Sequence, residues 1–341
     1  MHRTGAFFFA KKMSLNALRA PADWKDDMTE TSGEWLSLLK TLKQTGRVAL
    51  ADWPSDAITP DQLGLLTQGP FIATPDSVRL YDERYLAAQL RQIDPTTNLR
   101  LFDVVDSTNT SMARDAQTRS LESPIYLAEF QTAGRGRRGR AWVGDFGRNV
   151  AMTMGYLPQR ELAELGGLSC VVGLAMVQML EDLGVRAALK WPNDVWVQDR
   201  KLAGILVELV QTPRGAFAVI GIGLNVDLSL ERMEVIDQEV TSLRSLDVVI
   251  SREDLVVAIY KNVLANVDLF VQEGFDRFIP AFNAVHRLQD SPAVLLAGRL
   301  TREGVIRGVD QDGALLFEEN GEICRVTGGE VSLRPSKFGK T

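Results

Sequence analysis

The chain has 341 residues, 45% of them hydrophobic, which is enough for two or three domains with full-sized cores. The net charge of −6 argues against a protein that works mainly by coating nucleic acid. Two cysteines (Cys170 and Cys324) and two histidines (His2 and His286) exclude a disulfide framework and leave little for a metal site or a histidine acid–base pair. We therefore expect a cytoplasmic protein, no metal ion held by its side chains, and chemistry that depends on Lys, Arg, Asp and a bound ligand.

Residues 1–31 are predicted to be a tail, because their apolar run is shorter than the h-region of a signal peptide. Residues 32–95 are predicted to form a small domain, in which Ser32 caps an amphipathic helix and a short second helix follows a Pro-rich turn. Its strand-like pieces lie over 48–50, 71–74 and 78–81. No apolar run elsewhere reaches the roughly 20 residues that span a bilayer, so we expect no membrane insertion.

Residues 96–289 alternate predicted strands with predicted helices. Strands are expected over 101–105, 125–130, 149–157 and 217–226, a hairpin over 195–209, and helices over 108–117, 169–183 and from the cap Ser251 to Gly274. After residue 290 the pattern changes to short strands separated by glycine turns, which indicates a small all-β barrel. These strands are expected over 294–296, 304–309, 314–318 and 323–326.

Residues 134–140 (GRGRRGR) pack three glycines and four arginines into seven positions directly after a predicted strand. Glycine lets the backbone approach a ligand closely, and arginine supplies a permanent charge with a donor fork that suits carboxylate and phosphate. The glycines also match GxGxxG, but no helix follows them, so we reject a dinucleotide-binding fold. We predict an anion-binding loop, with a solvated basic loop as the plain alternative.

Residues 190–194 (KWPND) form a predicted turn that leads into the hairpin and places Asp194 and Lys201 on opposite strands. A lysine there would stabilise the negative charge that develops when a carboxylate attacks an α-phosphate, and Asp194 would orient a metal ion or a ribose. An Asx turn with a surface ion pair explains the same residues without any ligand.

Small polar residues at 106–109 (DSTN) lie between a predicted strand and a predicted helix, where one of them caps the helix. The others, together with Gln131, suit a neutral polar ring that carries both donors and acceptors, such as a ureido ring. Residues 221–225 (GIGLN) end a strand, and their glycines fit either a kinked buried strand or the close approach of a ligand.

Taken together, these motifs resemble those of the bacterial biotin protein ligases that carry an N-terminal extra domain. The similarity covers about residues 99–335 and keeps the family order: DSTN at 106–109, QTAGRGRRGRAW at 131–142, KWPNDVWVQDRKLAGILVEL at 190–209, GIGLNV at 221–226 and GGEVSLR at 328–334. The resemblance implies an α+β fold. Its parts would be a degenerate winged-helix-like domain over 32–95, a central mixed-sheet catalytic domain of the biotin/lipoate ligase type over 96–289, and an SH3-like β-barrel over 290–336.

The resemblance also implies an enzyme that uses ATP and Mg²⁺ to join biotin to a lysine of the biotin carboxyl carrier protein of acetyl-CoA carboxylase, through biotinyl-adenylate. Biotin would contact Ser107, Thr108, Asn109, Gln131, Arg135, Gly136, Arg137 and Lys201. ATP or the adenylate would contact Arg137, Arg138, Arg140, Trp142, Lys190, Asn193, Asp194 and Asn225. Lys201, Arg137 and Asp194 would carry the chemistry, and homodimerisation through a sheet edge is a further implication.

Two features depart from the family pattern. Residues 33–90 contain five Lys or Arg against seven Asp or Glu, and phosphate contacts dominate affinity for DNA, so the balance argues against DNA binding. Residues 228–242, where the family often places an aromatic residue over adenine, contain none. The alternative functions are a repressor of biotin genes that uses biotinyl-adenylate as its corepressor, and a lipoate or octanoate transferase, which is expected to lack GRGRRGR and KWPND.

Overall fold

The computed structural model describes residues 47–49, 71–73, 77–80, 98–119, 121–145, 147–228, 233, 236, 238–297, 300–328 and 331–335. The chain divides into two compact units, one of residues 1–64 and 71–80 and one of residues 65–70 and 81–341. In the first unit, three strands form an antiparallel sheet in the order β1-β3-β2: β1 (Arg47–Ala49), β2 (Phe71–Ala73) and β3 (Ser77–Leu80). These strands were predicted, whereas the predicted tail and the predicted helices of the N-terminal domain, including a third one expected over 82–92, lie outside the described residues.

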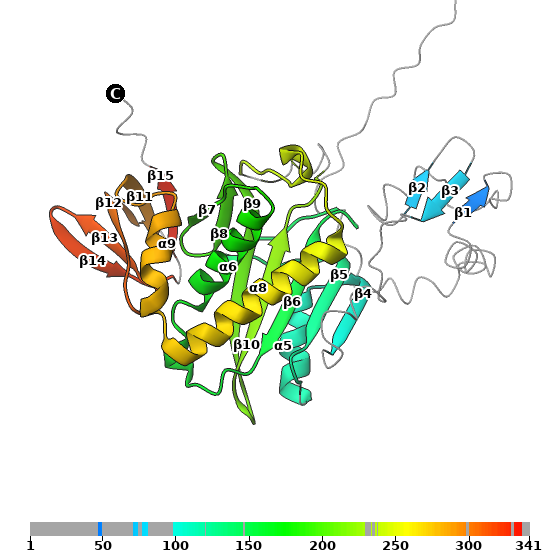
Figure 1. Cartoon of the computed structure of the whole chain (residues 1–341), viewed down its shortest axis with the longest axis horizontal. Coiled ribbons are helices and arrows are strands. Elements are labelled where there is room, and N and C mark those ends of the chain that lie inside the picture. The colour runs from blue at the N-terminus through cyan, green and yellow to red at the C-terminus, as the bar shows by residue number, and fades with distance from the viewer. Residues whose placement is uncertain are drawn as a thin grey trace, which may run out of the picture. The chain divides into compact units, whose positions relative to one another are not determined.

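A seven-stranded sheet forms the centre of the second unit (Figure 1). Its strands, in spatial order, are β4 (Leu99–Val105), β5 (Ile125–Gln131), β6 (Val150–Tyr156), β10 (Gly215–Leu224), β9 (Arg200–Thr212), β8 (Asp194–Val197) and β7 (Ala188–Lys190). Strands β4 and β5 run parallel and every other pairing is antiparallel, so the sheet is mixed, as the α+β prediction required.

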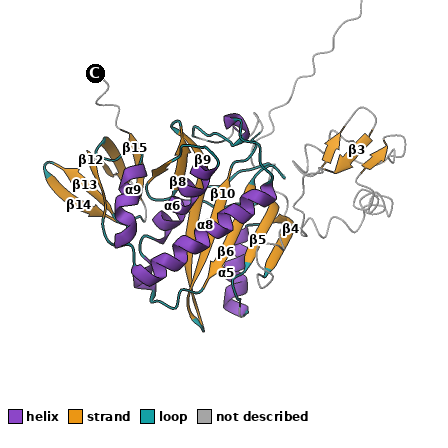
Figure 2. Cartoon of the chain, viewed as in Figure 1, coloured by secondary structure: helices purple, strands orange, loops and turns teal. Residues whose placement is uncertain are grey.

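Helices cover both faces of this sheet (Figure 2). Helices α6 (Leu168–Asp182) and α8 (Arg252–Glu273) share one core with the side chains of Leu127, Met152 and Ile220. Helix α5 (Thr108–Thr118) shares a second core with Tyr126, Phe217 and Val219. Because successive side chains of a strand point to opposite faces, the alternation of Val219 and Ile220 between the two cores places α5 on the face opposite α6 and α8.

Helix α8 has the predicted boundaries and the predicted buried stripe. The Ser251 side chain accepts a hydrogen bond from the Asp254 N–H at 3.0 Å, and Gly274 follows the last turn with φ of 81°. The stripe is fully buried and consists of Leu255, Ile259, Val263, Val267 and Phe270. The 3.6-residue period of the sequence therefore identified the face of α8 that packs onto the core.

The segment Leu162–Asp182, which contains α6, is long and apolar enough to cross a membrane by length and composition, and 61% of its most apolar window is buried. Helix α6 buries residues around most of its circumference against α8 and strand β9. Burial around most of its circumference in a protein core accounts for its apolar composition.

The C-terminal part of the second unit is a five-stranded antiparallel sheet in the order β14-β13-β12-β11-β15. The strands are β11 (Pro292–Ala297), β12 (Leu300–Val309), β13 (Leu315–Glu319), β14 (Glu322–Val326) and β15 (Val331–Pro335). The all-β prediction is confirmed, while β15 and the preceding helix α9 (Ile279–Val285) were not predicted. The SH3-like closure of these strands stays a prediction.

A buried ion pair joins the start of α8 to the central sheet, and we expect its disruption to lower stability. Arg252 Nη2 lies 2.8 Å from Glu129 Oε2, and both side chains are 6% exposed. Substituting Glu129→Gln leaves the guanidinium buried with a neutral partner, so the free energy of unfolding in urea should fall by about 3 kcal/mol. The matched control is Glu273→Gln, which breaks the exposed Glu273–Arg277 pair and should cost less than about 0.5 kcal/mol. Equal losses of unfolding free energy in the two variants would contradict the conclusion that the buried pair stabilises the protein more than the exposed pair does.

Candidate active site

The DSTN motif begins helix α5 directly after strand β4. The Ser107 N–H donates to Asp106 Oδ1 at 2.7 Å, and the Ser107 hydroxyl accepts from the Thr110 N–H at 3.4 Å. Ser107 is therefore the residue that caps the helix, as predicted for one member of this motif. The cap fixes the backbone of α5, so the two residues that follow enter the helix with their side chains toward the sheet.

Thr108 and Asn109 are buried in a network that joins α5 to three strands. The Thr108 N–H and hydroxyl both donate to Gln131 Oε1, at 2.8 and 3.1 Å. The Thr153 hydroxyl donates to Asn109 Oδ1 at 2.7 Å and lies 2.8 Å from Thr108 Oγ1. Asn109 Nδ2 donates to Leu206 O at 3.1 Å and to the carboxylate of Glu208 at 3.0 Å. Three of the four predicted ring-binding residues thus form one rigid cluster.

Gly221 makes this network geometrically feasible. Thr153, Gly221 and Leu206 are register partners across β6, β10 and β9, and Asn109 lies on the middle strand. A Cβ at position 221 would lie 2.1 Å from Asn109 Oδ1, which no side chain can accept. The glycine at 221 therefore makes room for Asn109, a side chain of this same chain, which is neither of the two reasons predicted for the glycines of GIGLN.

A second pair of glycines provides a flat surface for Trp142. Gly204 and Gly223 are register partners on β9 and β10, and a Cβ at Gly223 would lie 2.3 Å from the indole ring. A Cβ at Gly204 would lie 3.1 Å from the same ring and 3.2 Å from Lys201 Nζ. The indole lies against the sheet on the α5 face, with the Lys201 ammonium 5.7 Å from its centre.

The GRGRRGR stretch forms a short hairpin loop with most of its arginines exposed. The Trp142 N–H donates to Gly134 O at 2.8 Å, the Gly136 N–H donates to Arg140 O at 2.7 Å, and Arg135 pairs with Ala141. Arg138 adopts a left-handed conformation with φ of 60° at the tip. The loop thus has a defined backbone, while Arg135, Arg138 and Arg140 remain exposed.

Two side chains hold this loop onto the sheet. Arg135 Nη2 lies 2.9 Å from Glu208 Oε1, and Arg137 Nη1 donates to Asn193 Oδ1 at 3.3 Å. Asn193 in turn donates from Nδ2 to Ile205 O at 2.6 Å. Burial lowers the pKa of Arg137, and the nearby Asp194 carboxylate opposes that shift. The loop arginines therefore meet both the DSTN network and the KWPND segment.

The predicted pair of Asp194 and Lys201 is present on opposite strands. Lys201 Nζ lies 2.7 Å from Asp194 Oδ1, and the two side chains are 14% and 15% exposed. Lys190 is nearby, with its ammonium 4.3 Å from the centre of the Trp196 ring. Burial lowers the pKa of Lys190, the charge of Asp194 opposes this, and Lys201, Arg140 and Arg334 lower it further. Many cations around one carboxylate create a potential that favours an anionic ligand.

Asn225 is 2% exposed and contacts the main chain of Lys201, not the side chains of this cluster. Its Nδ2 donates to Thr241 O at 3.1 Å and to Lys201 O at 3.4 Å. Val240, beside it, pairs with Lys201 in an isolated bridge. Asn225 therefore helps to fix the backbone of Lys201. Its predicted contact with the nucleotide stays a prediction.

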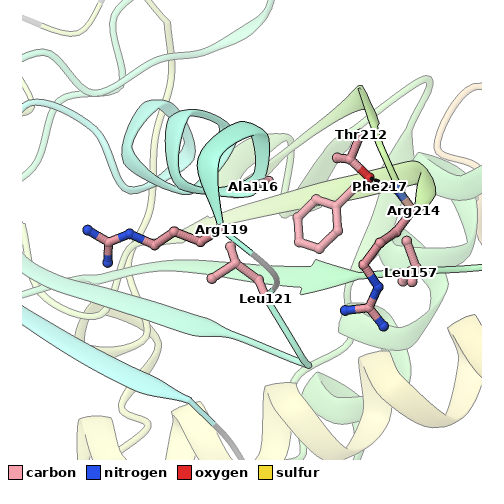
Figure 3. A pocket seen from close by; sticks show the side chains of 7 residues that line it. All are labelled: Ala116, Arg119, Leu121, Leu157, Thr212, Arg214 and Phe217. Carbon is pink, nitrogen blue, oxygen red and sulfur yellow. Dashed lines mark hydrogen bonds between the residues drawn. The ribbon is translucent and has the colours of Figure 1, made fainter.

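Two pockets among the described residues contain no predicted site residue. The first, of about 10 Å³, lies at the far end of α5 between Ala116, Leu121, Leu157 and Phe217, and its volume is at the lower limit for one water molecule (Figure 3). The second, of about 370 Å³, lies beside β7 between Arg186, Trp196 and Arg287. The candidate site is a cationic surface between the Arg loop and the part of the sheet that carries Gly204, Gly221 and Gly223.

Within the part of the chain that the structure describes, no three side chains of His, Cys, Asp or Glu lie close enough together to hold a metal ion. The residues that the sequence did not indicate are Thr153 and Glu208. Both sit on strands, far in sequence from the residues they contact.

His286 is buried beside the KWPND segment, and its titration should be visible in the stability of the protein. Burial lowers its pKa from 6.5 to about 4. The unfolded chain therefore binds a proton at this residue in a pH range where the folded protein does not, so stability falls as the pH falls from about 6.5 towards 4. From pH 7 to pH 5 the contribution is a loss of about 2 kcal/mol in urea unfolding.

The variant His286→Gln should lack this loss of unfolding free energy between pH 7 and pH 5. Because the only other histidine is His2, the difference in pH dependence between the two proteins isolates residue 286. An identical pH dependence in both proteins would contradict the assignment of a low pKa to the folded state.

Comparison with known proteins gives a consistent set of similarities. Residues 101–225 match the model of the Biotin/lipoate A/B protein ligase family, and residues 294–334 match the Biotin protein ligase C terminal domain. The Bifunctional ligase/repressor BirA of Salmonella typhimurium is 34% identical over 326 residues, which cover 95% of this chain and 98% of that protein. The Biotin--[acetyl-CoA-carboxylase] ligase of Mycobacterium tuberculosis is 31% identical over 265 residues, which cover 73% and 94%.

Among solved structures, the biotin protein ligase from Aquifex aeolicus in complex with biotin and ATP aligns with a TM-score of 0.60 and 26% identity. The alignment covers 70% of this chain and 99% of that one. The first family model spans the DSTN network, the Arg loop, the KWPND segment and Asn225, and the second spans most of β11 to β15.

Proposed function

This chain belongs to the biotin protein ligases, and from that premise we propose that it uses ATP to join biotin to one lysine of the biotin carboxyl carrier protein of acetyl-CoA carboxylase. The observation that carries the proposal is the Lys201–Asp194 pair, 2.7 Å apart, beside a loop with four arginines. The choice of substrates is supported by the Aquifex relative, solved with biotin and ATP, and by the mycobacterial relative, named for acetyl-CoA carboxylase.

In the first step, a carboxylate oxygen of biotin attacks the α-phosphorus of ATP. A new P–O bond forms as the bond to pyrophosphate breaks, which leaves biotinyl-adenylate. Negative charge rearranges over oxygens in the transition state, so fixed cations accelerate the step without accepting a proton. Lys201, held by Asp194, would stand at the carboxylate and α-phosphate, and Arg137, held by Asn193, would neutralise the phosphates.

The remaining cations and Trp142 would hold the rest of the nucleotide. Arg138, Arg140 and Lys190 would meet the phosphates, and Mg²⁺ bound to ATP would share their charge. Asp194, besides holding Lys201, would face the ribose. No histidine is needed, because the step involves no proton transfer.

The ring of biotin would lie at the start of α5. Ser107, Thr108 and Asn109, supported by Thr153, offer hydroxyl and amide groups beside Gln131. Arg135 and Gly136 would close over the ring from the loop, which Glu208 anchors. A neutral ureido group suits these uncharged donors and acceptors better than it suits the cationic surface next to them.

In the second step, the neutral ε-amine of the carrier lysine attacks the acyl carbon of biotinyl-adenylate. An amide bond forms, AMP leaves with the electrons of the broken C–O bond, and the amine gives a proton to solvent. The Arg loop would cover the mixed anhydride and reopen for the carrier. A lid that excludes water protects the anhydride from hydrolysis before the lysine arrives.

The test is the intact mass of a purified carrier domain after incubation with this protein, biotin, ATP and Mg²⁺. We expect a gain of one biotinyl group that requires ATP and is absent from a carrier whose acceptor lysine is replaced by arginine. Lipoate or octanoate in place of biotin tests the transferase alternative in the same assay. No gain on a carrier that a known ligase modifies would contradict the proposal.

A second function as repressor is favoured by one observation. The match to the Salmonella protein, named a ligase/repressor, covers 95% of this chain and so extends into the N-terminal domain. The excess of acidic residues over 33–90 opposes it. The test is binding to DNA upstream of the biotin genes of the same genome, measured by fluorescence anisotropy with and without biotin and ATP. Binding that requires both ligands would support the repressor function, and no binding would rule it out.

Three finer features belong to the same proposal. The N-terminal domain would be a winged helix, β11 to β15 would close into an SH3-like barrel, and two chains would pair along an exposed sheet edge. The part of β9 beyond Gly204 has no β8 partner on that side, and an unpaired edge is able to add a strand. We also place the protein in the cytoplasm, because Cys170 and Cys324 are both free thiols in the described structure and the cytoplasm is reducing.

A further inference from the structure

We propose that His286 is a positioning residue that holds the KWPND segment in the geometry from which Asn193 and Asp194 act. The proposal rests on the proposed function, because it assigns a task within the adenylation site. The sequence indicated no role for His286, and the reaction described above uses no histidine.

The contact itself is specific. The Trp191 N–H donates to His286 Nε2 at 3.1 Å, and both residues are buried. A backbone N–H is only a donor, so Nε2 must carry the lone pair and Nδ1 the proton. Burial, which lowers the pKa of His286 to about 4, keeps the ring in this neutral form at working pH.

The surrounding contacts hold the imidazole in one place. His286 pairs with Leu189 in an isolated bridge, the Arg287 N–H donates to Leu189 O at 2.7 Å, and the ring stacks on Phe282. Among the described residues, His286 Nδ1 has no hydrogen-bond partner although it is buried. An unpaired buried N–H is destabilising, so a histidine here is not explained by stability alone.

Trp191 is also held from the other side, because its indole Nε1–H donates to Gly313 O, in the turn between β12 and β13, at 3.0 Å. Two residues further on, Asn193 bonds Arg137, and three residues further on, Asp194 bonds Lys201. Loss of the His286 contact would release the segment at the residue just before Pro192, and the displacement would reach both groups.

The experiment compares His286→Leu, which removes the acceptor, with His286→Gln, whose Oε1 restores one. The matched control is Asn283→Leu, in helix α9, which ends just before His286; this change removes the acceptor of the Val309 N–H (3.2 Å) and leaves Trp191 untouched. We expect His286→Leu to lower kcat for adenylate formation by about 10- to 100-fold, as sub-ångström to 1 Å displacements do. The kcat of His286→Gln should lie within about 3-fold of the kcat of the unmutated protein. The kcat of Asn283→Leu should lie in the same range, although its Tm should fall about as much as that of His286→Leu.

Amide hydrogen exchange gives a readout that does not depend on activity. Exchange across residues 191–194 should be faster in His286→Leu than in Asn283→Leu, and the Trp191 amide of the unmutated protein should exchange as slowly as the amides of β9. Equal rates and equal exchange in the two leucine variants would overturn the positioning role. If the unmutated protein makes no adenylate, the proposed function fails, and the exchange data still decide whether His286 holds the segment.

Discussion

Replacing Lys201 with alanine should lower the rate of biotinyl-adenylate formation by about 10²- to 10³-fold, the effect of removing one fixed donor that faces developing charge. The lysine is 14% exposed and bonded to Asp194, so its ammonium is already in place before substrates bind. A fixed cation need not reorganise during the step, and for that reason its loss is not replaced by water. The measurement is pyrophosphate release in the presence of biotin and ATP, in single turnover.

Two further variants sharpen this result. Lys261→Ala removes an exposed lysine from α8, far in sequence from the site, and should leave the rate unchanged. Asp194→Asn keeps Lys201 but removes the charge that orients it, so its rate should fall by a smaller factor, about 10-fold or more. A Lys201→Ala protein as fast as Lys261→Ala would contradict the role of Lys201.

Gly221→Ala should raise the KM for biotin by about 100-fold and lower the stability by about 3 kcal/mol, since overpacking a rigid core displaces buried groups. The added methyl would lie 2.1 Å from Asn109 Oδ1 and 2.9 Å from Nδ2. Asn109 is 3% exposed and bonded to Leu206, Glu208 and Thr153, so it has no free direction in which to move. Urea unfolding and steady-state kinetics measure the two effects.

A double-mutant cycle separates this clash from other causes. In an Asn109→Ala background the side chain that collides is gone, so adding Gly221→Ala should change stability by less than about 0.5 kcal/mol. If the alanine at 221 is as destabilising in that background as in the unmutated protein, the clash with Asn109 is not the cause.

Local signals in the sequence located most of the fold. Ser251 and Gly274 bound α8 because capping chemistry is encoded within one turn of the helix. The DSTN segment was placed at a helix start for the same reason, and the KWPND segment at a hairpin entry because Pro, Asn and Asp encode a turn locally. The short strand β7 was missed because three residues give no periodic signal, and β15 was missed although its sequence VSLRP alternates apolar and polar residues, because five residues are a short window.

The site was predictable where a motif carries its own chemistry and unpredictable where it depends on pairing between distant strands. Lys201 and Asp194 are joined by a hairpin of a few residues, so their contact follows from local structure. Glu208 meets Arg135, and Thr153 meets Asn109, only because β9, β10 and β6 are neighbours in register. His286 reaches Trp191 across 95 residues.

The central claim is that this cationic surface makes biotinyl-adenylate before any carrier protein is present. The most direct test incubates the protein with biotin and ATP labelled at the α-phosphate, separates protein from free nucleotide, and then adds carrier domain. We predict about one labelled adenylate retained per chain, released as AMP when the carrier gains its biotinyl group. The claim would be contradicted if no labelled adenylate forms under any condition, whether or not the carrier becomes biotinylated.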